Sequence, residues 1–521
     1  MIPLFTSEQV RAADNYAIKK LGIPSIVLME NASLSIFHSI LEYVPDLNFN
    51  DTVGIIAGKG NNGGDGFALA RQLFNAGIPV KVISMGKENQ LKGDALTNYR
   101  ILKKLIADSR ISSLKTFTSL RDLNQFSSCL IIVDALLGTG AKGELKKPYA
   151  GIVEKLNKFD AIRVAVDIPT GLDIDTAFTK LCFDADLTVS LAELKRGLFY
   201  NSGYAYSGEV VQGSIGLGDE YFDSLNVNDY LIEPEDCENN LPVKEIDAHK
   251  YSGGKVLTIA GSGDLPGAAF FTANTVLASG GGASVLAFPN SMKQMAQQML
   301  DGVTVISYED NNSAIFKNQN IAELEEKIKW ADVIALGPGL GREEDTRNAV
   351  IQLLKNYKNK KFVIDADAIY ALRNKAYKKV DLTNKVLTPH HKEFSDLLGI
   401  ELFDLKKNIL EIGRKFTRET KAYLVLKGAP TIIFNPEGEA FINSSGNEGM
   451  AKFGTGDVLT GLIASMIAQS GEIENAVIAS IYLHGLSADL LLDKLTEFGV
   501  SASGIMNNIP RAIKFLRKSV V

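Results

Sequence analysis

The stretch IIAGKGNNGGDGFALARQL, residues 55–73, decides the fold class of the first part of this chain. An apolar run ends at a glycine-rich loop, and a helical pattern follows from Phe67, so the stretch predicts a buried strand, a loop and a helix. Glycines at positions 58, 60 and 63 have the Gly-x-Gly-x-x-Gly spacing of a dinucleotide-binding turn. An aspartate follows, although a pyrophosphate gains nothing from a negative charge.

Similar apolar runs of strand length recur along the 521 residues and alternate with helical patterns. Unbroken apolar runs are typical of strands that are buried on both faces, and such sheets are mostly parallel. The sequence therefore predicts an α/β protein. The runs are TVGIIAG, VKVISMG, LIIVDALL, RVAVDIPTG, KVLTIAGS, DVIALGPG, KFVIDAD, KVLTPH and AYLVLKG.

Length and composition indicate a soluble globular protein with at least two domains. Hydrophobic residues make up 45% and charged residues 22% of the chain. Residues 213–247 are acidic and irregular, so we place a boundary near residue 222 and expect domains at 1–222 and 223–521. The net charge of −6 disfavours a nucleic-acid partner. The three scattered cysteines and the lack of a signal segment or membrane span predict a cytoplasmic protein, and we expect a homo-oligomer.

Two common nucleotide-binding interpretations of the first loop are disfavoured. A hydride-transferring Rossmann domain needs an acidic residue for the ribose at the end of the second strand. That strand ends in Ser84 and Met85, and Glu88 lies beyond its turn. A phosphate-binding P-loop needs Gly-Lys-Ser or Gly-Lys-Thr, which does not follow here.

Three strands of the first half end in loops with polar side chains. The carboxyl ends of parallel strands meet at one edge of a sheet, so Asn62, Asp134, Asp167 and Thr170 are expected to converge there. Their oxygens, with the carbonyls of glycine-rich turns, suit a hard cation. For any single aspartate, capping of the following helix is the alternative interpretation.

These loops carry a family resemblance. GKGNNGGDGFALARQL, VDALLGTGAKGE and VDIPTGLDID, preceded by LGIPSIVLMENAS, resemble the YjeF N-terminal domain of NAD(P)H-hydrate epimerases over about residues 1–218. The resemblance implies a Rossmann-like three-layer α/β/α domain with potassium bound by Asn62, Asp134 and Thr170. It also implies a site for hydrated NADH and NADPH (NADHX and NADPHX), lined by Asn61, Asn62, Gly63, Gly64, Asp65, Gly138, Thr139, Gly140, Ala141, Lys142, Gly143, Glu144 and Asp167.

Epimerisation of such a substrate requires an acid and a base. The hydrated ring carries a hydroxyl on C6 beside the ring nitrogen, and its inversion needs proton transfers to and from that oxygen or nitrogen. Asp167 and Lys142 are the expected pair. Ring opening and loss and return of water both remain open as routes.

The segment NEGMAKFGTGDVLTGLIASMIAQSG, residues 447–471, dominates the second half. Gly454, Gly456 and Asp457 stand before an apolar helix, whose N-terminus offers N–H groups to phosphate oxygens. Asp457 can then act as a base on a hydroxyl that accepts a phosphoryl group. A simple helix cap is the alternative interpretation.

The second half resembles the ribokinase-like NAD(P)H-hydrate dehydratases, the YjeF C-terminal family, over about residues 225–515. The matching motifs are HKYSGGKVLTIAGSGDLPGAAFFTAN, ADVIALGPGLGRE, FVIDADAIYAL, LTPHHKEFSDLL, LVLKGAPTIIF and GTGD. The resemblance implies substrate contacts from Ala269, Gly339, His390 and Asp457. It implies an adenine-nucleotide site at Lys427, Gly428, Ala429, Pro430, Thr431 and Gly456, where ADP or ATP binds with Mg²⁺.

Together these features predict a bifunctional repair enzyme that interconverts the two epimers and dehydrates the S form. Phosphorylation converts the C6 hydroxyl into a better leaving group, and elimination of phosphate restores the dihydropyridine. One alternative is a ribokinase-type small-molecule kinase. Another makes the first half a non-catalytic binding or scaffold module.

Overall fold

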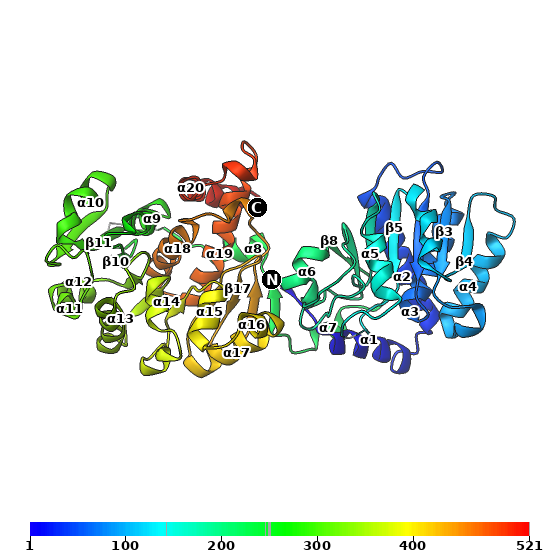
Figure 1. The fold of residues 1–521 in the computed structure, drawn as a ribbon, viewed down its shortest axis with the longest axis horizontal. Coiled ribbons are helices and arrows are strands. Elements are labelled where there is room, and N and C mark those ends of the chain that lie inside the picture. Colours follow the sequence, from blue (N-terminus) through cyan, green and yellow to red (C-terminus); the bar gives the residue numbers. More distant parts are fainter. Residues whose placement is uncertain (142, 245, 248–251, 520–521) are drawn as a thin grey trace. The chain divides into compact units, whose positions relative to one another are not determined.

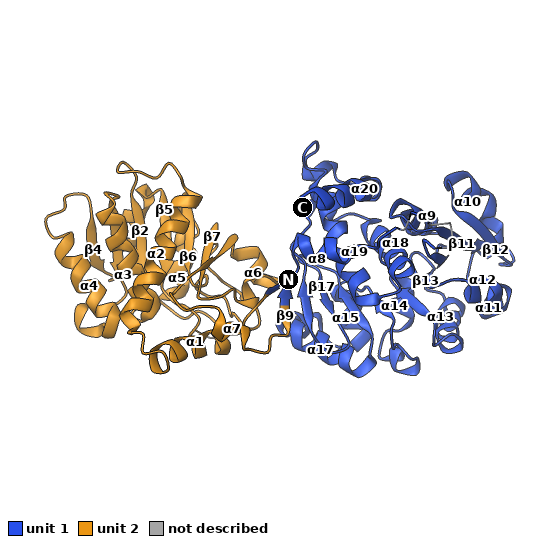
Figure 2. Ribbon diagram, turned by 180° about the vertical axis from the view of Figure 1, so that it is seen from behind, with its two compact units in different colours: residues 1–2, 230–521 blue, residues 3–229 orange. Residues whose placement is uncertain are grey.

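The computed structural model describes residues 1–141, 143–244, 246–247 and 252–519. The chain forms two compact units (Figure 2). The N-terminal unit comprises Pro3–Asp229, and the C-terminal unit comprises Met1–Ile2 and Tyr230–Val521. Lys142, one of the predicted catalytic residues, lies outside the described residues.

The N-terminal unit is built on a seven-stranded parallel sheet (Figure 1). Its strand order reverses between β2 and β5, so the chain builds the sheet outward in both directions from that point. In spatial order the strands are β4 (Ser113–Thr116), β3 (Val80–Ser84), β2 (Val53–Ala57), β5 (Ile131–Ala135), β6 (Ile162–Val166), β7 (Leu187–Leu191) and β8 (Glu209–Gly213).

Two hydrophobic layers flank this sheet, as the predicted three-layer architecture requires. Ile55 and Val133 pack into one apolar cluster, whereas their neighbours Ile56 and Ile132 pack into another, because successive side chains of a strand point to opposite faces. The helices of the unit are α1 (Ser7–Lys19), α2 (Ser25–Tyr43), α3 (Asn61–Asn75), α4 (Gly93–Leu105), α5 (Tyr149–Leu156), α6 (Asn201–Tyr206) and α7 (Glu220–Asp223).

The start of α3 differs from the sequence prediction. We expected a loop up to Phe67, but the helix begins at Asn61. A Cβ atom on Gly63 would lie 2.0 Å from the carbonyl oxygen of Gly58, and one on Gly66 would lie 2.7 Å from Cβ of Ala135. The glycines therefore let the first turns of α3 press against the strand ends, and they do not form an open phosphate-binding loop.

The C-terminal unit is built on a second, mixed sheet. The strands from β10 to β16 pair in parallel, whereas β16, β17 and β18 pair antiparallel. The eleven strands of the sheet, in spatial order, are β1 (Ile2–Pro3), β9 (Asp229–Leu231), β18 (Ala440–Ile442), β17 (Ile432–Phe434), β16 (Tyr423–Leu426), β15 (Val386–Leu387), β14 (Lys361–Ile364), β13 (Val333–Leu336), β10 (Lys255–Ile259), β11 (Ala283–Pro289) and β12 (Thr304–Tyr308).

Apolar helices α9 (Pro266–Ala278) and α18 (Thr455–Ser470) pack against this second sheet, and α19 (Ile473–Asp489) packs on α18. The shorter α15 (His391–Leu398) follows β15, and α20 (Ala502–Ser519) packs on α19 and α9. The others are α8 (Pro234–Asn239), α10 (Lys293–Met299), α11 (Asn318–Glu323), α12 (Glu325–Trp330), α13 (Glu344–Asn356), α14 (Asp367–Ala371), α16 (Leu402–Lys407) and α17 (Ile409–Thr420). None of the helices in the described part of the chain has the length and apolarity needed to cross a membrane.

Candidate active sites

The first site lies at the carboxyl edge of the N-terminal sheet. Asp134 pairs in register with Ile56 on one side and with Ala165 on the other, and Asp167 follows the last residue of β6. The parallel pairing therefore brings the loops after β2, β5 and β6 to one edge, where the strand order reverses. This is the convergence that the sequence predicted.

Asp134 and Thr170 are in direct contact. The Thr170 hydroxyl donates to Oδ1 of Asp134 and its backbone N–H donates to Oδ2, both at 2.8 Å. The Leu136 N–H also donates to Oδ1, at 3.1 Å. Burial raises the pKa of the Asp134 carboxyl to about 6, although these hydrogen bonds oppose the rise. A buried carboxylate of this kind gains from a bound cation.

Asn62 lies in the first turn of α3, beside the loop after β5. A Cβ atom on Gly138 would lie 3.3 Å from the Asn62 side-chain oxygen and 2.8 Å from Oδ2 of Asp167. Glycine at position 138 therefore lets the amide and the carboxylate meet. Within the described residues, the buried side-chain nitrogen of Asn62 has no hydrogen-bond partner, so protein neighbours do not fix this end of the amide.

Asp167 is held from both sides. Its Oδ2 accepts hydrogen bonds from the N–H of Thr139 at 2.8 Å and from the Thr139 hydroxyl at 2.6 Å. Its Oδ1 lies 2.9 Å from Nζ of Lys195, which follows β7. Arg11 on α1 donates to the Thr139 carbonyl at 3.1 Å, so the first helix also supports this loop.

Two more carboxyl groups belong to the surroundings of Asp167. Asp65 on α3 is 7% exposed, and burial raises its pKa well above the ordinary value, with the charges of Asp167 and Asp14 adding to the rise. Asp14 on α1 is exposed, yet the surrounding protein and Asp167 still raise its pKa, whereas Lys195 lowers it. The site therefore combines the Asp167 carboxylate, which is paired with Lys195, with two carboxyl groups, Asp14 and Asp65, whose pKa values are raised above the ordinary value.

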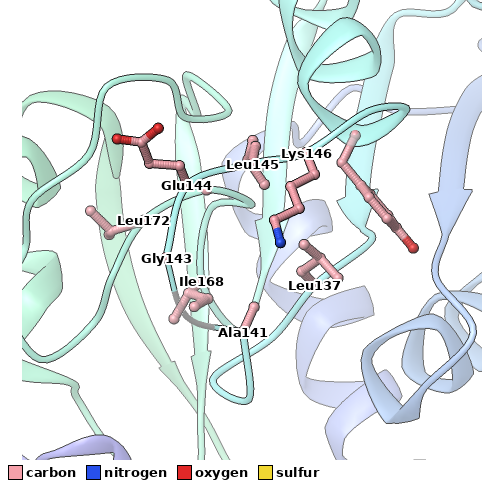
Figure 3. A pocket seen from close by; sticks show the side chains of 10 residues that line it. Leu137, Ala141, Gly143, Glu144, Leu145, Lys146, Ile168 and Leu172 are labelled. Atoms are coloured by element: carbon pink, nitrogen blue, oxygen red, sulfur yellow. The ribbon is translucent and has the colours of Figure 1, made fainter.

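A small cavity opens beside the loop after β5 (Figure 3). Its volume is about 80 Å³, which is too small for a dinucleotide, because ligand pockets typically hold roughly 300–1,000 Å³. Ala141, Gly143 and Glu144, all predicted substrate contacts, line it, and the Glu144 carboxylate pairs with Lys180 at 2.7 Å. Gly140 belongs to the same loop.

The second site is organised by the first turn of α18. The helix begins at Thr455, so Gly456 and Asp457 belong to it and do not precede it as the sequence suggested. Gly454 has a φ of 91°, in the left-handed region that favours glycine. Burial raises the pKa of the Asp457 carboxyl to about 7, with the charge of Asp365 adding to the rise and the ammonium of Lys427 opposing it. A carboxylate tuned to neutral pH suits a general base.

Lys427, at the end of β16, reaches the same place. Its Nζ lies 2.6 Å from Oδ1 of Asp365, whose Oδ2 accepts the Thr460 hydroxyl at 2.8 Å. A Cβ atom on Gly456 would lie 3.3 Å from this ammonium. Burial lowers the pKa of Lys427, but Asp365 and Glu393 outweigh burial and raise it overall. A fixed cation therefore stands beside the helix N-terminus that was predicted to hold phosphate.

His390 caps the N-terminus of α15, and the residue before it contacts the Lys427–Thr431 segment through a backbone hydrogen bond. Its Nδ1 accepts from the N–H groups of Lys392 at 3.1 Å and Glu393 at 3.2 Å. The Lys427 N–H donates to the Pro389 carbonyl at 2.8 Å, which connects this turn to the Lys427–Thr431 segment. Within the described chain, the His391 Nε2 has no partner, and burial lowers the pKa of that imidazole to about 4.

The start of α9 connects the remaining predicted substrate contacts. Gly339 has a φ of 61°, and a Cβ atom there would lie 2.4 Å from the Leu265 carbonyl oxygen. Ala269 is fully buried on α9, and the Thr272 hydroxyl, one turn further, donates to the Asp457 carbonyl at 3.2 Å. These contacts bring the glycine loop after β13 and the first turn of α18 to one helix.

Several residues of these sites were missed by the sequence analysis. Asp365 and Asp367 follow β14, and a strand-end aspartate, the signal used at Asp134, would have found them. Asp367 accepts from the N–H of Gly341 at 3.0 Å and pairs with Arg342 at 2.7 Å. Lys195 carried no motif that would have marked it.

Comparison with known proteins agrees with this division. A family profile described as YjeF-related protein N-terminus matches residues 25–197, and one described as NAD(P)H-hydrate dehydratase matches residues 256–511. A protein of Moorella thermoacetica named bifunctional NAD(P)H-hydrate repair enzyme Nnr is 34% identical over 99% of this chain and 98% of its own length. A Thermofilum pendens protein of the same name is 32% identical over 98% of this chain and 96% of its own length.

Among solved structures, the ADP/ATP-dependent NAD(P)H-hydrate dehydratase from Bacillus subtilis, co-crystallised with ATP/Mg²⁺, is 30% identical. The match covers 55% of this chain and 98% of the Bacillus subtilis chain, with a TM-score of 0.49.

Fold and sites define a two-unit α/β enzyme in which a Rossmann-like unit is joined to a ribokinase-like, nucleotide-binding unit. Similarity above 30% identity extends over almost the whole chain and over almost the whole of each relative. The chain belongs to the family of bifunctional NAD(P)H-hydrate repair enzymes.

Proposed function

We propose that this family member repairs hydrated NADH and NADPH in two successive steps, with epimerisation on residues 1–222 and dehydration on residues 223–521. The observation that carries the proposal is the union of both family profiles in one chain that matches bifunctional relatives along its length. A stereospecific dehydratase consumes one epimer, so a fused epimerase keeps it supplied. A kinase joined to a scaffold module would not need the polar groups gathered around Asp167.

In the dehydration step, Asp457 takes the proton of the C6 hydroxyl as that oxygen attacks the terminal phosphoryl group of ADP or ATP. The N–H groups at the start of α18 and the Lys427 ammonium stabilise the transferring charge. The C6–O bond then breaks with loss of a proton from C5, so phosphate leaves and the dihydropyridine returns. Ala269, Gly339 and His390 position the hydrate, and Lys427, Gly428, Ala429, Pro430, Thr431 and Gly456 position the nucleotide.

The C-terminal site, at the start of α18, would hold Mg²⁺ together with the nucleotide phosphates. The described residues contain no group of three His, Cys, Asp or Glu side chains that could hold a metal, and a nucleotide-bound Mg²⁺ needs few protein ligands because it keeps several waters and phosphate oxygens. Asp365 and Asp367, which follow β14, are the carboxylates available for water-mediated contact. When bound, the ion offsets the negative charge of the phosphates.

In the epimerisation step, Asp167 exchanges the proton of the C6 oxygen. Residues 61–65 and 138–144 line the site of the hydrated substrate, and Lys142 is the predicted second proton carrier. Asn62, Asp134 and Thr170 fit a potassium ion, because they offer three kinds of oxygen: one buried carboxylate, one hydroxyl and one side-chain amide. When bound, potassium supplies a fixed positive charge for the substrate phosphates.

The cell compartment and the assembly state stay predictions. All three cysteines are buried free thiols, which supports a reducing, cytoplasmic setting. We also propose that the protein is a homo-oligomer.

Enzyme assays with separated epimers test the proposed function. The S epimer of hydrated NADH with ADP or ATP should regain the near-ultraviolet absorbance of the dihydropyridine, with release of inorganic phosphate. The R epimer should do so at a rate far above its spontaneous inversion. A stable phosphorylated product would instead favour a small-molecule kinase.

A further inference from the structure

Lys195 belongs to none of the motifs that define the first site. Its side chain is completely buried, although lysine is rarely buried unless it is paired. Its ammonium lies 2.9 Å from Oδ1 of Asp167, and it donates to the Ser190 hydroxyl at 3.0 Å and to the Leu191 carbonyl at 2.7 Å. All three protons of the ammonium therefore have an acceptor.

The neighbouring carboxylate is almost saturated in turn. A carboxylate has about four lone-pair positions. At Asp167, Lys195 and the two donors of Thr139 use three of them. The side chain is 13% exposed, so one acceptor position is left for a substrate hydroxyl. Asp167 also has a φ of 70°, which a residue other than glycine keeps only where its surroundings hold it.

The paired strands explain why these two residues meet. Val166 and Val189 are in register, and the Asp167 N–H donates to the Val189 carbonyl at 2.9 Å. The loop after β7 therefore runs beside the end of β6, and the Lys195 side chain turns back to the carboxylate.

We propose that Lys195 is a positioning residue of the epimerisation reaction: its buried ammonium fixes the orientation of the Asp167 carboxylate, so that the remaining lone pair faces the substrate proton. This inference rests on the proposed epimerase function. It adds a cation to the site that is separate from the predicted proton carrier Lys142.

Lys195 is the cation in contact with Asp167, in surroundings that also hold acidic side chains. Asp14 on α1 and Asp65 on α3 both interact with the Asp167 charge, and Glu193 interacts with the Lys195 charge. Arg11 binds the Thr139 carbonyl and does not reach the carboxylate directly. The orientation of the Asp167 carboxylate therefore depends on Lys195 and Thr139.

The test compares Lys195→Met with the wild-type full chain. Pure R epimer is supplied without nucleotide, and formation of the S epimer is followed by chromatography. We expect kcat to fall by about 10²-fold with a much smaller change in KM. Dehydration of the S epimer with ADP, carried out by the C-terminal unit, should stay at the wild-type rate.

Arg196→Met is the matched control. Arg196 is the adjacent residue, and its largely buried guanidinium pairs with Asp229 at 3.2 Å, so its loss removes a similar ion pair from the same unit. This variant should keep a kcat for epimerisation close to that of the wild type. Lys195→Arg, which keeps the charge, should recover most of the kcat that Lys195→Met loses, and Lys195→Gln replaces the Met variant if that variant does not fold.

A loss of kcat in the Met or Gln variant that is no larger than that of Arg196→Met would show that Lys195 is only structural. Wild-type protein that does not interconvert the epimers would instead contradict the proposed function itself.

Discussion

Replacing Asp457 by asparagine separates catalysis from helix capping. A general base contributes about 10² to 10⁴ in rate, so Asp457→Asn should lose that much dehydration activity while nucleotide binding largely survives. Because burial raises the pKa of this carboxyl to about 7, wild-type activity should rise about tenfold between about pH 6 and pH 8 as the base ionises.

The same substitution should make the protein more stable. The folded-state pKa of about 7 lies above the ordinary value of 3.8, so the folded protein binds this proton more tightly than the unfolded chain does. Stability is therefore lost as pH rises from about 4 to about 7, and the full cost, about 4 kcal/mol, is present at about pH 8. Asparagine removes that cost. A carboxylate that only served the helix dipole would instead stabilise by about 0.3–1 kcal/mol.

Both quantities can be measured on one preparation. Dehydration is followed by the returning dihydropyridine absorbance, and the free energy of unfolding is obtained from urea titrations at about pH 8, without nucleotide. Asp345→Asn, the same change in the first turn of α13 at an exposed position, is the matched control: it should leave dehydration unchanged and lower the free energy of unfolding by about 0.3–1 kcal/mol at most. Asp457→Asn protein that is fully active, or that is less stable than the wild type, would refute this reasoning.

Three further expectations concern other parts of the chain. The wild type should lose epimerisation activity when potassium is replaced by lithium or tetramethylammonium, and Asp134→Ala should abolish both this activity and its dependence on potassium. Full wild-type activity in tetramethylammonium would exclude a potassium site. A chain of residues 223–521 should fold and dehydrate the S epimer alone, measured by circular dichroism and absorbance, and an insoluble product would count against the predicted boundary. Lys427→Met leaves the buried Asp365 without its cation, so dehydration should fall by about 10²-fold and KM for ADP should rise, whereas the exposed Lys415→Met should match the wild type.

The strands and the positions of the site loops could be predicted from local sequence. A strand buried on both faces needs an unbroken apolar run, and all nine predicted runs form strands. The strand-end aspartates Asp134 and Asp167 were found because parallel strands place their carboxyl ends at one edge. Chain direction and hydrophobic pattern carry this information without any knowledge of distant contacts.

The start of α3 could not be predicted in the same way. Glycine disfavours a helix by about 1 kcal/mol relative to alanine, so local propensity placed the first turn at Phe67. In the structure, Gly63 packs on Gly58 and Gly66 packs on Ala135, and this close packing makes the glycine-rich segment helical. The partner of Gly66 lies in another strand, β5, far along the chain, and is invisible to a local pattern.

The sequence by itself therefore determined the fold class and placed the loops that we propose to carry the chemistry at the ends of parallel strands. Only the tertiary structure decided how the charges are paired. Lys195 reaches Asp167 from the next strand, and Lys427 reaches Asp365 from a strand two places away in the sheet. The reason is electrostatic: the ionisation of a carboxyl depends on its burial and on charges within a few ångströms, and those neighbours are set by packing between distant parts of the chain.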